Sequence, residues 1–227
     1  MVNRIIIPLD LKYSDARKMV DQFDPKICRL KIGKQLFTSA GPLAVKEFLS
    51  MGFDIFLDLK FHDIPNTVYE AVKSAADHGV WMTNVHASGG EEMLAASKKA
   101  LDDFESPPLL IGVTVLTSLS QDSLKEIGFN NLEDQVLRLA GLVKNSGLDG
   151  VVCAPTDITS IKTKFGNSFL SVTPGVRPED ADSNDQYRIS TPSEAIKRGA
   201  DYIVIGRPIT QAKNPQEALE KIHKEIS

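Results

Sequence analysis

Short apolar runs rich in branched residues recur along the chain and alternate with longer stretches of helical spacing. The runs predict eight strands, at about 5–9, 28–33, 54–60, 82–87, 109–116, 150–154, 169–173 and 202–207. Helices are predicted at about 14–23, 41–51, 65–78, 91–102, 132–144, 157–164, 191–198 and 215–226. The chain is therefore expected to repeat a strand–helix unit eight times.

This alternation determines the expected fold class. Near-continuous apolar strands separated by amphipathic helices indicate a parallel sheet covered by helices. Eight such units in 227 residues favour a closed (β/α)8 TIM barrel of the α/β class over an open doubly wound sheet. No Gly-x-Gly-x-x-Gly motif follows the first strand, which weakens a dinucleotide-binding alternative. No break in composition divides the chain, so we expect residues 1–227 to form a single catalytic domain.

Composition and charge exclude several classes of partner. The hydrophobic content of 42% and the charged content of 25% are typical of soluble globular proteins. The net charge is −4, and no basic stripe or polybasic run indicates binding to nucleic acid or to a membrane surface. No apolar run approaches the length of a membrane span, and the N-terminus lacks a signal-peptide pattern. Cys28 and Cys153 lie far apart in apolar runs, so we expect two reduced core cysteines and a cytoplasmic protein.

The stretch from Phe56 to Thr67 concentrates charge at the end of the third strand. Asp58 and Lys60 are two residues apart, so on an extended strand they point to the same face. A lone buried charge is costly, so this pair must be either a structural ion pair or part of a catalytic site. The stretch alone leaves both interpretations open.

Polar residues also fall near the ends of other predicted strands, where TIM barrels carry their chemistry. These residues are Asp10, Lys31, His86, Thr117, Thr173 and Arg207. Asp10 could instead begin a turn, and Lys31 could extend its ammonium to solvent. The residues converge on one site only if the sheet closes, and their joint placement favours such a site.

The last strand indicates what kind of ligand binds. Gly206 allows backbone amides to approach an anion, and Arg207 offers a fork of donors that matches phosphate oxygens. Loops after the seventh and eighth strands commonly form a phosphate site in these barrels. The polar segment 175–190 is interpreted as a lid over that site. The alternatives are an ordinary turn with a surface arginine and a plain loop.

Together these residues resemble the orotidine 5′-monophosphate decarboxylase family, and the resemblance covers the chain from Asp10 to Arg207. The spacing Asp58-x-Lys60-x-x-Asp63 is shared by a wider superfamily of barrels. Four longer motifs are more specific to the decarboxylases: His-Asp-Ile-Pro-Asn-Thr at 62–67, Leu-Lys-Ile-Gly-Lys at 30–34, Thr-Pro-Gly-Val-Arg-Pro at 173–178 and Ile-Gly-Arg-Pro at 205–208.

The resemblance implies a function and a catalytic array. Family members convert orotidine 5′-monophosphate to UMP and CO2, the last step of de novo pyrimidine nucleotide synthesis, without a metal or an organic cofactor. Lys60 corresponds to the proton donor to ring carbon 6, and Asp58 to the acid that faces the substrate carboxylate. Lys31 belongs to the same charge array and reaches the ribose, while Asp10 matches the other ribose ligand. Asp63 completes the array.

The same resemblance implies further substrate contacts and a homodimer. Asp63 and Thr67 correspond to residues that enter the neighbouring subunit's site. Thr117 matches a residue beside the pyrimidine edge. The residues that correspond to phosphate contacts are Arg177, Gln186, Gly206 and Arg207, of which Gln186 also links the phosphate to the base.

Two other functions compete with this one. A sugar-phosphate lyase or decarboxylase of the same superfamily would use Mg²⁺ to hold an enediolate. The second strand offers Lys31 where such a metal enzyme would need a carboxylate. A non-catalytic protein that binds nucleotide phosphates is the other alternative, and the complete charge array argues against it. The role of His86, either lining the pocket or buried in the core, stays open.

Overall fold

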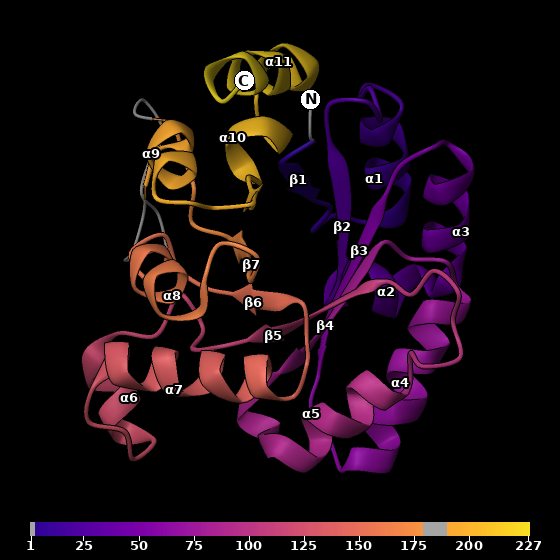
Figure 1. Cartoon of the computed structure of the whole chain (residues 1–227). Coiled ribbons are helices and arrows are strands. Elements are labelled where there is room, and N and C mark those ends of the chain that lie inside the picture. The colour runs from indigo at the N-terminus through magenta and orange to yellow at the C-terminus, as the bar shows by residue number, and fades with distance from the viewer. Residues whose placement is uncertain (1–2, 179–189) are drawn as a thin grey trace.

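The computed structural model describes residues 3–178 and 190–227, and within them eight parallel strands close into a barrel (Figure 1). The strands follow chain order around the barrel, and the last pairs with the first. They are β1 (Ile5–Pro8), β2 (Arg29–Gly33), β3 (Ile55–Phe61), β4 (Met82–His86), β5 (Leu109–Val113), β6 (Gly150–Val152), β7 (Leu170–Thr173) and β8 (Tyr202–Val204). The predicted (β/α)8 barrel is therefore confirmed.

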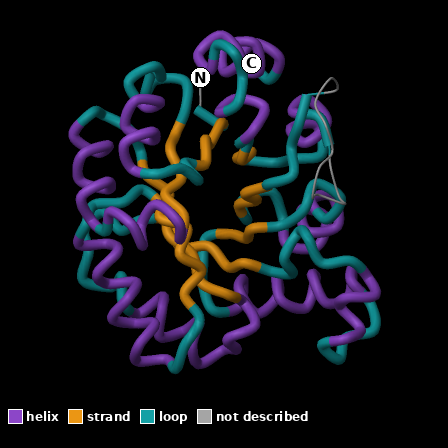
Figure 2. The backbone as a smooth tube through the Cα atoms, turned by 180° about the vertical axis from the view of Figure 1, so that it is seen from behind, coloured by secondary structure: helices purple, strands orange, loops and turns teal. Residues whose placement is uncertain are grey.

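Helices surround the strands, which occupy the centre of the molecule in Figure 2. In the described part of the chain they are α1 (Tyr13–Val20), α2 (Lys34–Ala40), α3 (Pro42–Ser50), α4 (Pro65–Asp77), α5 (Gly90–Lys99), α6 (Gln121–Glu126), α7 (Leu132–Asn145), α8 (Ile158–Phe165), α9 (Pro192–Lys197), α10 (Arg207–Thr210) and α11 (Pro215–Glu225), with a 3₁₀ turn η1 (Ala87–Gly89). Each predicted helix is present. Proline stands in the first turn of five of the helices, where its missing N–H costs no hydrogen bond.

Three short helices, α2, α6 and α10, were not predicted, and several strands end before the predicted residue, β5 and β8 by three residues each. Strand β5 stops at Val113, and β8 stops at Val204. Arg207 is therefore not the end of a strand but the first residue of α10. The backbone of Gly206, with φ −98° and ψ −102°, leaves the extended region, and Pro208 favours a helical first turn.

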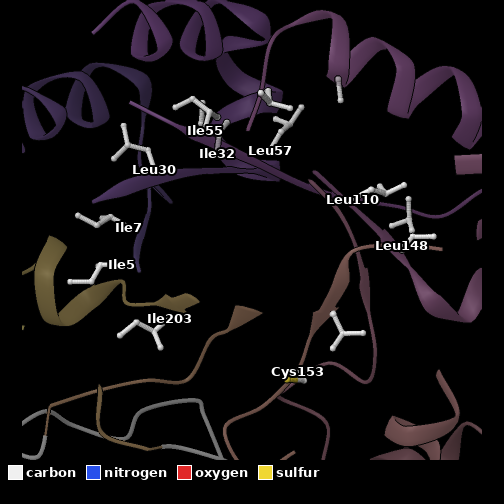
Figure 3. Close-up of a cluster of buried hydrophobic side chains, with 14 of the residues drawn as sticks. Ile5, Ile7, Leu30, Ile32, Ile55, Leu57, Leu110, Leu148, Cys153 and Ile203 are labelled. Atoms are coloured by element: carbon white, nitrogen blue, oxygen red, sulfur yellow. The ribbon is translucent and has the colours of Figure 1, made fainter. Parts of the chain in front are cut away.

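Alternate residues of the strands build two hydrophobic layers. Ile5 and Ile7 of β1 point outward into a large core between the barrel and its helices, together with Leu30 and Leu57 (Figure 3). Ile6, which lies between them in sequence, points inward. All of these side chains are essentially inaccessible to solvent. The strands are buried on both faces, which explains their continuous apolar sequence.

The inward layer fills the barrel near the amino ends of the strands. It consists of Ile6, Phe56, Met82, Ile111 and Val172. Trp81 and Tyr202 pack against this layer with ring centroids 5.0 Å apart, and the Arg29 guanidinium lies 4.2 Å from the Trp81 centroid. Because these side chains fill the barrel near the amino ends, a ligand inside it would lie toward the carboxyl ends of the strands.

Two further expectations concern the whole chain. Cys28 and Cys153 are both buried, as predicted for core cysteines. Burial raises the pKa of the Cys28 thiol to about 12, so it stays protonated at neutral pH. Of the helices in the described ranges, none combines the length and the hydrophobicity that crossing a bilayer requires.

Candidate active site

A cavity of about 540 Å³ opens at the carboxyl ends of the strands. Its floor is apolar and includes Phe56, Val152, Val172 and Val204, which belong to the inward layer or pack against it. Its polar wall is formed by residues in or just after β1, β2 and β3, in the segments after β5, β7 and β8, and at the start of α10: Asp10, Lys31, Asp58, Lys60, Thr117, Arg177, Gly206 and Arg207. Most of the predicted site residues thus line one cavity.

Asp58 is the centre of the charged wall. Its carboxylate is 2.9 Å from Lys31 Nζ through one oxygen and 2.6 Å from Lys60 Nζ through the other. The residue is only 6% exposed. Burial by itself raises the pKa of this carboxyl, but the charges of Lys31 and Lys60 and their hydrogen bonds outweigh burial and hold the pKa below its ordinary value. Asp58 is therefore ionised at neutral pH and links the two ammonium groups.

Lys31 connects this centre to the rim. Its Nζ is 3.8 Å from Asp10, whose side chain is 60% exposed. Gly33 leaves room for this contact, because a Cβ there would lie 3.0 Å from Lys31 Nζ and 3.2 Å from an Asp10 oxygen. The glycine of the Leu-Lys-Ile-Gly-Lys motif thus has a steric role beside the two charged residues.

Lys60 meets Asp58 by a different geometry from the one predicted. We expected an extended strand, in which residues two apart share a face. Instead, β3 is irregular between Leu57 and Phe61, and Lys60 has a φ of +53°. Among the described residues other than glycine, it alone has a positive φ. A bulge and a left-handed residue, rather than simple alternation, bring the ammonium to the carboxylate.

The opposite wall carries two arginines. Arg177 is 7% exposed, and Arg207 begins α10 directly after Gly206. Gly206 packs closely on the first strand, since a Cβ there would lie 3.0 Å from Pro8 Cγ. Gln186 and most of the predicted lid lie outside the described residues.

The two ends of the predicted lid segment are held together. The Arg177 N–H donates to the Ser190 carbonyl at 2.9 Å, and the Ser190 N–H donates to the Gly175 carbonyl at 3.3 Å. The segment therefore begins and ends at one point on the cavity rim, because Gly175 and Arg177 both line the cavity.

Asp63 and Thr67 do not line this chain's cavity. Both are exposed and lie at the amino end of α4, where the Asp63 carboxylate accepts a hydrogen bond from the Ile64 N–H at 2.7 Å. Ile64 itself is 67% exposed. Within one chain, therefore, the structure does not bring Asp63 into the charge array.

His86 ends β4 beside the site without lining the cavity. Its ring lies beside that of His62, with centroids 5.4 Å apart and the two planes tilted by 39°. Burial, followed by the charges of His62, Lys60 and Lys34, lowers the pKa of His86 to about 4. Its imidazole is therefore neutral at pH 7 and adds no charge to the array.

Asn84 is a site residue that the sequence did not reveal. Its side-chain amide donates to Asp58 at 2.7 Å and accepts from the Lys60 N–H at 2.8 Å. The sole signal was a polar residue inside a buried strand. Among the described residues, no group of three or more His, Cys, Asp or Glu side chains is arranged to hold a metal ion.

Comparisons with known proteins agree with this site. Residues 3–222 match the sequence model of the orotidine 5′-phosphate decarboxylase / HUMPS family. The orotidine 5′-phosphate decarboxylase of Saccharophagus degradans is 52% identical over 99% of this chain and 95% of its own length. That of Aliivibrio fischeri is 54% identical over 99% and 97%.

A solved structure shows the same architecture. The crystal structure of orotidine 5′-phosphate decarboxylase from Lactobacillus acidophilus superposes with a TM-score of 0.89 at 40% identity, and the match covers 100% of both chains. Sequence and fold therefore agree over the full length: the chain belongs to the orotidine 5′-phosphate decarboxylase / HUMPS family.

Proposed function

We propose that this protein decarboxylates orotidine 5′-monophosphate to UMP and CO2, the last step of de novo pyrimidine nucleotide synthesis. The observation that carries the proposal is the buried Asp58 carboxylate between the Lys31 and Lys60 ammonium groups, at 2.9 and 2.6 Å, in the wall of the barrel cavity. Similarity to proteins named orotidine 5′-phosphate decarboxylase extends along 99% of the chain and supports the same substrate.

Lys60 is the proton donor in this proposal. The bond between ring carbon 6 and the carboxylate breaks, CO2 leaves, and the electron pair stays on carbon 6. No adjacent carbonyl accepts that charge as an enolate, so the carbanion needs a fixed cation beside it. The Lys60 ammonium stabilises the developing charge and then transfers its proton to carbon 6.

Asp58 has two effects in the same step. Its negative charge offsets the two neighbouring ammonium groups and restricts the movement of Lys60. Facing the substrate carboxylate, it also disfavours the bound substrate relative to the state in which CO2 has left. Both effects depend on the carboxylate being ionised, which its lowered pKa ensures.

The remaining cavity residues bind the parts of the nucleotide that do not react. Asp10 and Lys31 hold the ribose hydroxyls, and Thr117 lies beside the pyrimidine edge. The phosphate is assigned to Arg177, Gln186, Gly206 and Arg207. The phosphate is remote from the bond that breaks, so its binding energy serves to hold the base against Lys60 and to close the lid.

Arg207→Ala is expected to raise the KM for orotidine 5′-monophosphate strongly. Charge-assisted hydrogen bonds contribute about 1.5 to 3 kcal/mol, which corresponds to a rise of roughly 10- to 150-fold. Steady-state kinetics measure this change, and kcat should also fall because the base is held less well. The exposed Arg138→Ala on α7 is the matched control and should leave KM unchanged. An unchanged KM for Arg207→Ala removes this residue from the phosphate site.

The reaction is proposed to need no metal. The single carboxylate at the centre of the array is already neutralised by two ammonium groups, which repel a divalent cation. Turnover, followed by loss of the orotate-ring absorbance, should therefore be unchanged after treatment with EDTA. Loss of activity in EDTA that Mg²⁺ restores would instead favour the sugar-phosphate lyase alternative. No turnover of orotidine 5′-monophosphate at all would contradict the proposed function.

We also propose a homodimer with shared sites, in which Asp63 and Thr67 enter the cavity of the neighbouring subunit. Two observations support it: both residues are exposed and lie outside their own chain's cavity, and the adjoining Ile64 is 67% exposed. A subunit that covered Ile64 would remove its apolar side chain from water, which favours association.

Mixing two inactive variants tests this arrangement. A dimer of one Lys60→Ala chain and one Asp63→Ala chain has one site with both substitutions and one site with neither. Equal mixing and re-association is therefore expected to restore about one quarter of wild-type activity, because half of the dimers carry one intact site out of two. Absence of any recovery, with mixed dimers demonstrated by mass spectrometry, would mean that each site is built from a single chain.

A further inference from the structure

Opposite Asn84, strand β3 contains more residues than its neighbour. Leu57 pairs with Thr83 and Phe61 pairs with Val85, so three residues of β3 occupy the interval that Asn84 alone occupies on β4. Regular ladder pairing is therefore interrupted at the segment that carries Asp58 and Lys60. Such bulges re-aim side chains next to active sites, and something must replace the lost ladder hydrogen bonds.

The Asn84 side chain supplies the replacement. Its Oδ1 accepts the hydrogen bond from the Lys60 N–H at 2.8 Å, and its Nδ2 donates to Asp58 Oδ1 at 2.7 Å. The same Asp58 oxygen receives the Lys60 ammonium at 2.6 Å. The two contacts fix the amide orientation, because a flipped amide would place an NH₂ group against the Lys60 N–H. Asn84 is fully buried, so it has no competing contact with bulk solvent.

The contact with Lys60 falls where the backbone is strained. A lysine at φ +53° occupies the left-handed region, which is unfavourable for a residue with a Cβ. Such conformations persist only where the surroundings hold them, and they cluster at functional sites. The hydrogen bond from the Lys60 N–H to Asn84 is the contact placed to hold it.

We infer that Asn84 is a positioning residue for the decarboxylation: by bridging the Lys60 backbone and the Asp58 carboxylate, it sets where the Lys60 ammonium lies in the cavity. Asn84 does not line the cavity, so it acts through these two residues and not on the nucleotide. The inference rests on the proposed function, since its kinetic effect is defined for that reaction.

Thr83 provides a matched control on the same strand. It is also fully buried, and its hydroxyl donates to the Leu57 carbonyl at 3.1 Å across the same pair of strands. It contacts neither Asp58 nor Lys60 in that bond. Thr83→Val therefore removes a buried hydrogen bond between β4 and β3 without touching the bridge.

The test compares Asn84→Leu, which keeps the approximate size of the side chain, with Thr83→Val. We expect Asn84→Leu to lower kcat about 100-fold, because misplacing a reacting group by about 1 Å slows a reaction by about that factor. The KM should change less than about threefold, because the contacts to the phosphate and the ribose remain. Thr83→Val should lower the thermal unfolding midpoint comparably but keep kcat close to that of wild type. Asn84→Ser, too short to span both partners, is the second variant if the leucine variant does not fold.

Crystal structures of the wild type and the Asn84 variant provide a readout that is independent of activity. Without Asn84, Lys60 should leave its positive φ, or its Nζ should shift by about 1 Å or more. The inference is overturned if both stay in place, or if Thr83→Val lowers kcat as much as Asn84→Leu does. A wild-type protein inactive on orotidine 5′-monophosphate would contradict the proposed function, and the crystallographic comparison would still decide whether Asn84 positions Lys60.

Discussion

Lys60→Ala is expected to fold and to assemble as the wild type does, but to lose decarboxylation. General acid catalysis and electrostatic stabilisation of the carbanion each contribute about 10²-fold or more, so kcat should fall by at least about 10⁴-fold. The fold should persist because Asp58 keeps the Lys31 ammonium at 2.9 Å and the Asn84 amide at 2.7 Å. Steady-state kinetics measure the loss, and circular dichroism with gel filtration checks the fold and the assembly.

The control for this variant is a lysine outside the cavity. Lys46 on α3 is exposed, so Lys46→Ala removes the same group without changing the site, and its kcat should match that of the wild type. Substantial turnover by Lys60→Ala would contradict the role of Lys60 as proton donor. Such a result would also leave the carbanion without a proposed source of stabilisation.

Asp58→Asn is expected to lose both stability and activity. The substitution leaves the Lys31 and Lys60 ammonium groups facing a neutral amide at a position that is only 6% exposed. Removing one charge of a buried ion pair typically lowers the free energy of unfolding by about 3 to 5 kcal/mol. The kcat should fall with it, because the two lysines then repel each other and Lys60 is no longer held. Denaturant unfolding at pH 7, together with kinetics, measures both losses.

The pH dependence of this stability difference has a defined sign. The pKa of Asp58 is lowered in the folded protein, so its carboxylate contributes stability fully above the unfolded pKa of about 3.9, and this contribution is lost as the pH falls through the folded value. The gap between wild type and Asp58→Asn should therefore be largest at neutral pH and shrink below about pH 4. Asp54→Asn is the control. It weakens the ion pair between Asp54 and Arg29, but the Asp54 side chain is 53% exposed, so the free energy of unfolding should change by less than about 1 kcal/mol. A gap that stays constant below pH 4 would mean that the Asp58 charge does not stabilise the fold.

The barrel was predictable because its strands carry a strong periodic signal. Runs such as Ile5–Ile7 are apolar on both faces, and only a sheet covered on both sides buries such runs. The short helices α2, α6 and α10 span four to seven residues each, too few for their spacing to establish a period. The end of β8 was wrong for a related reason: the turn at Gly206 depends on backbone angles that the sequence does not specify.

The site was predictable in its composition and less so in its geometry. The contact between Asp58 and Lys60 follows from their spacing, but the bulge and the positive φ that produce it depend on pairing with β4. Asn84 was missed for the same reason, since its partners lie 24 and 26 residues away on another strand. Asp63 belongs to the catalytic array only if a second chain is present, so neither the spacing nor the structure of one chain establishes its place.

The central claim is that the Lys60 ammonium stands beside ring carbon 6 of the nucleotide. A crystal structure with bound UMP, the proposed product, tests it most directly. We predict that the uracil ring occupies the cavity with carbon 6 about 3 to 3.5 Å from Lys60 Nζ and with the phosphate against Arg177 and Arg207. A base bound with carbon 6 far from Lys60, or a metal ion between them, would contradict the account.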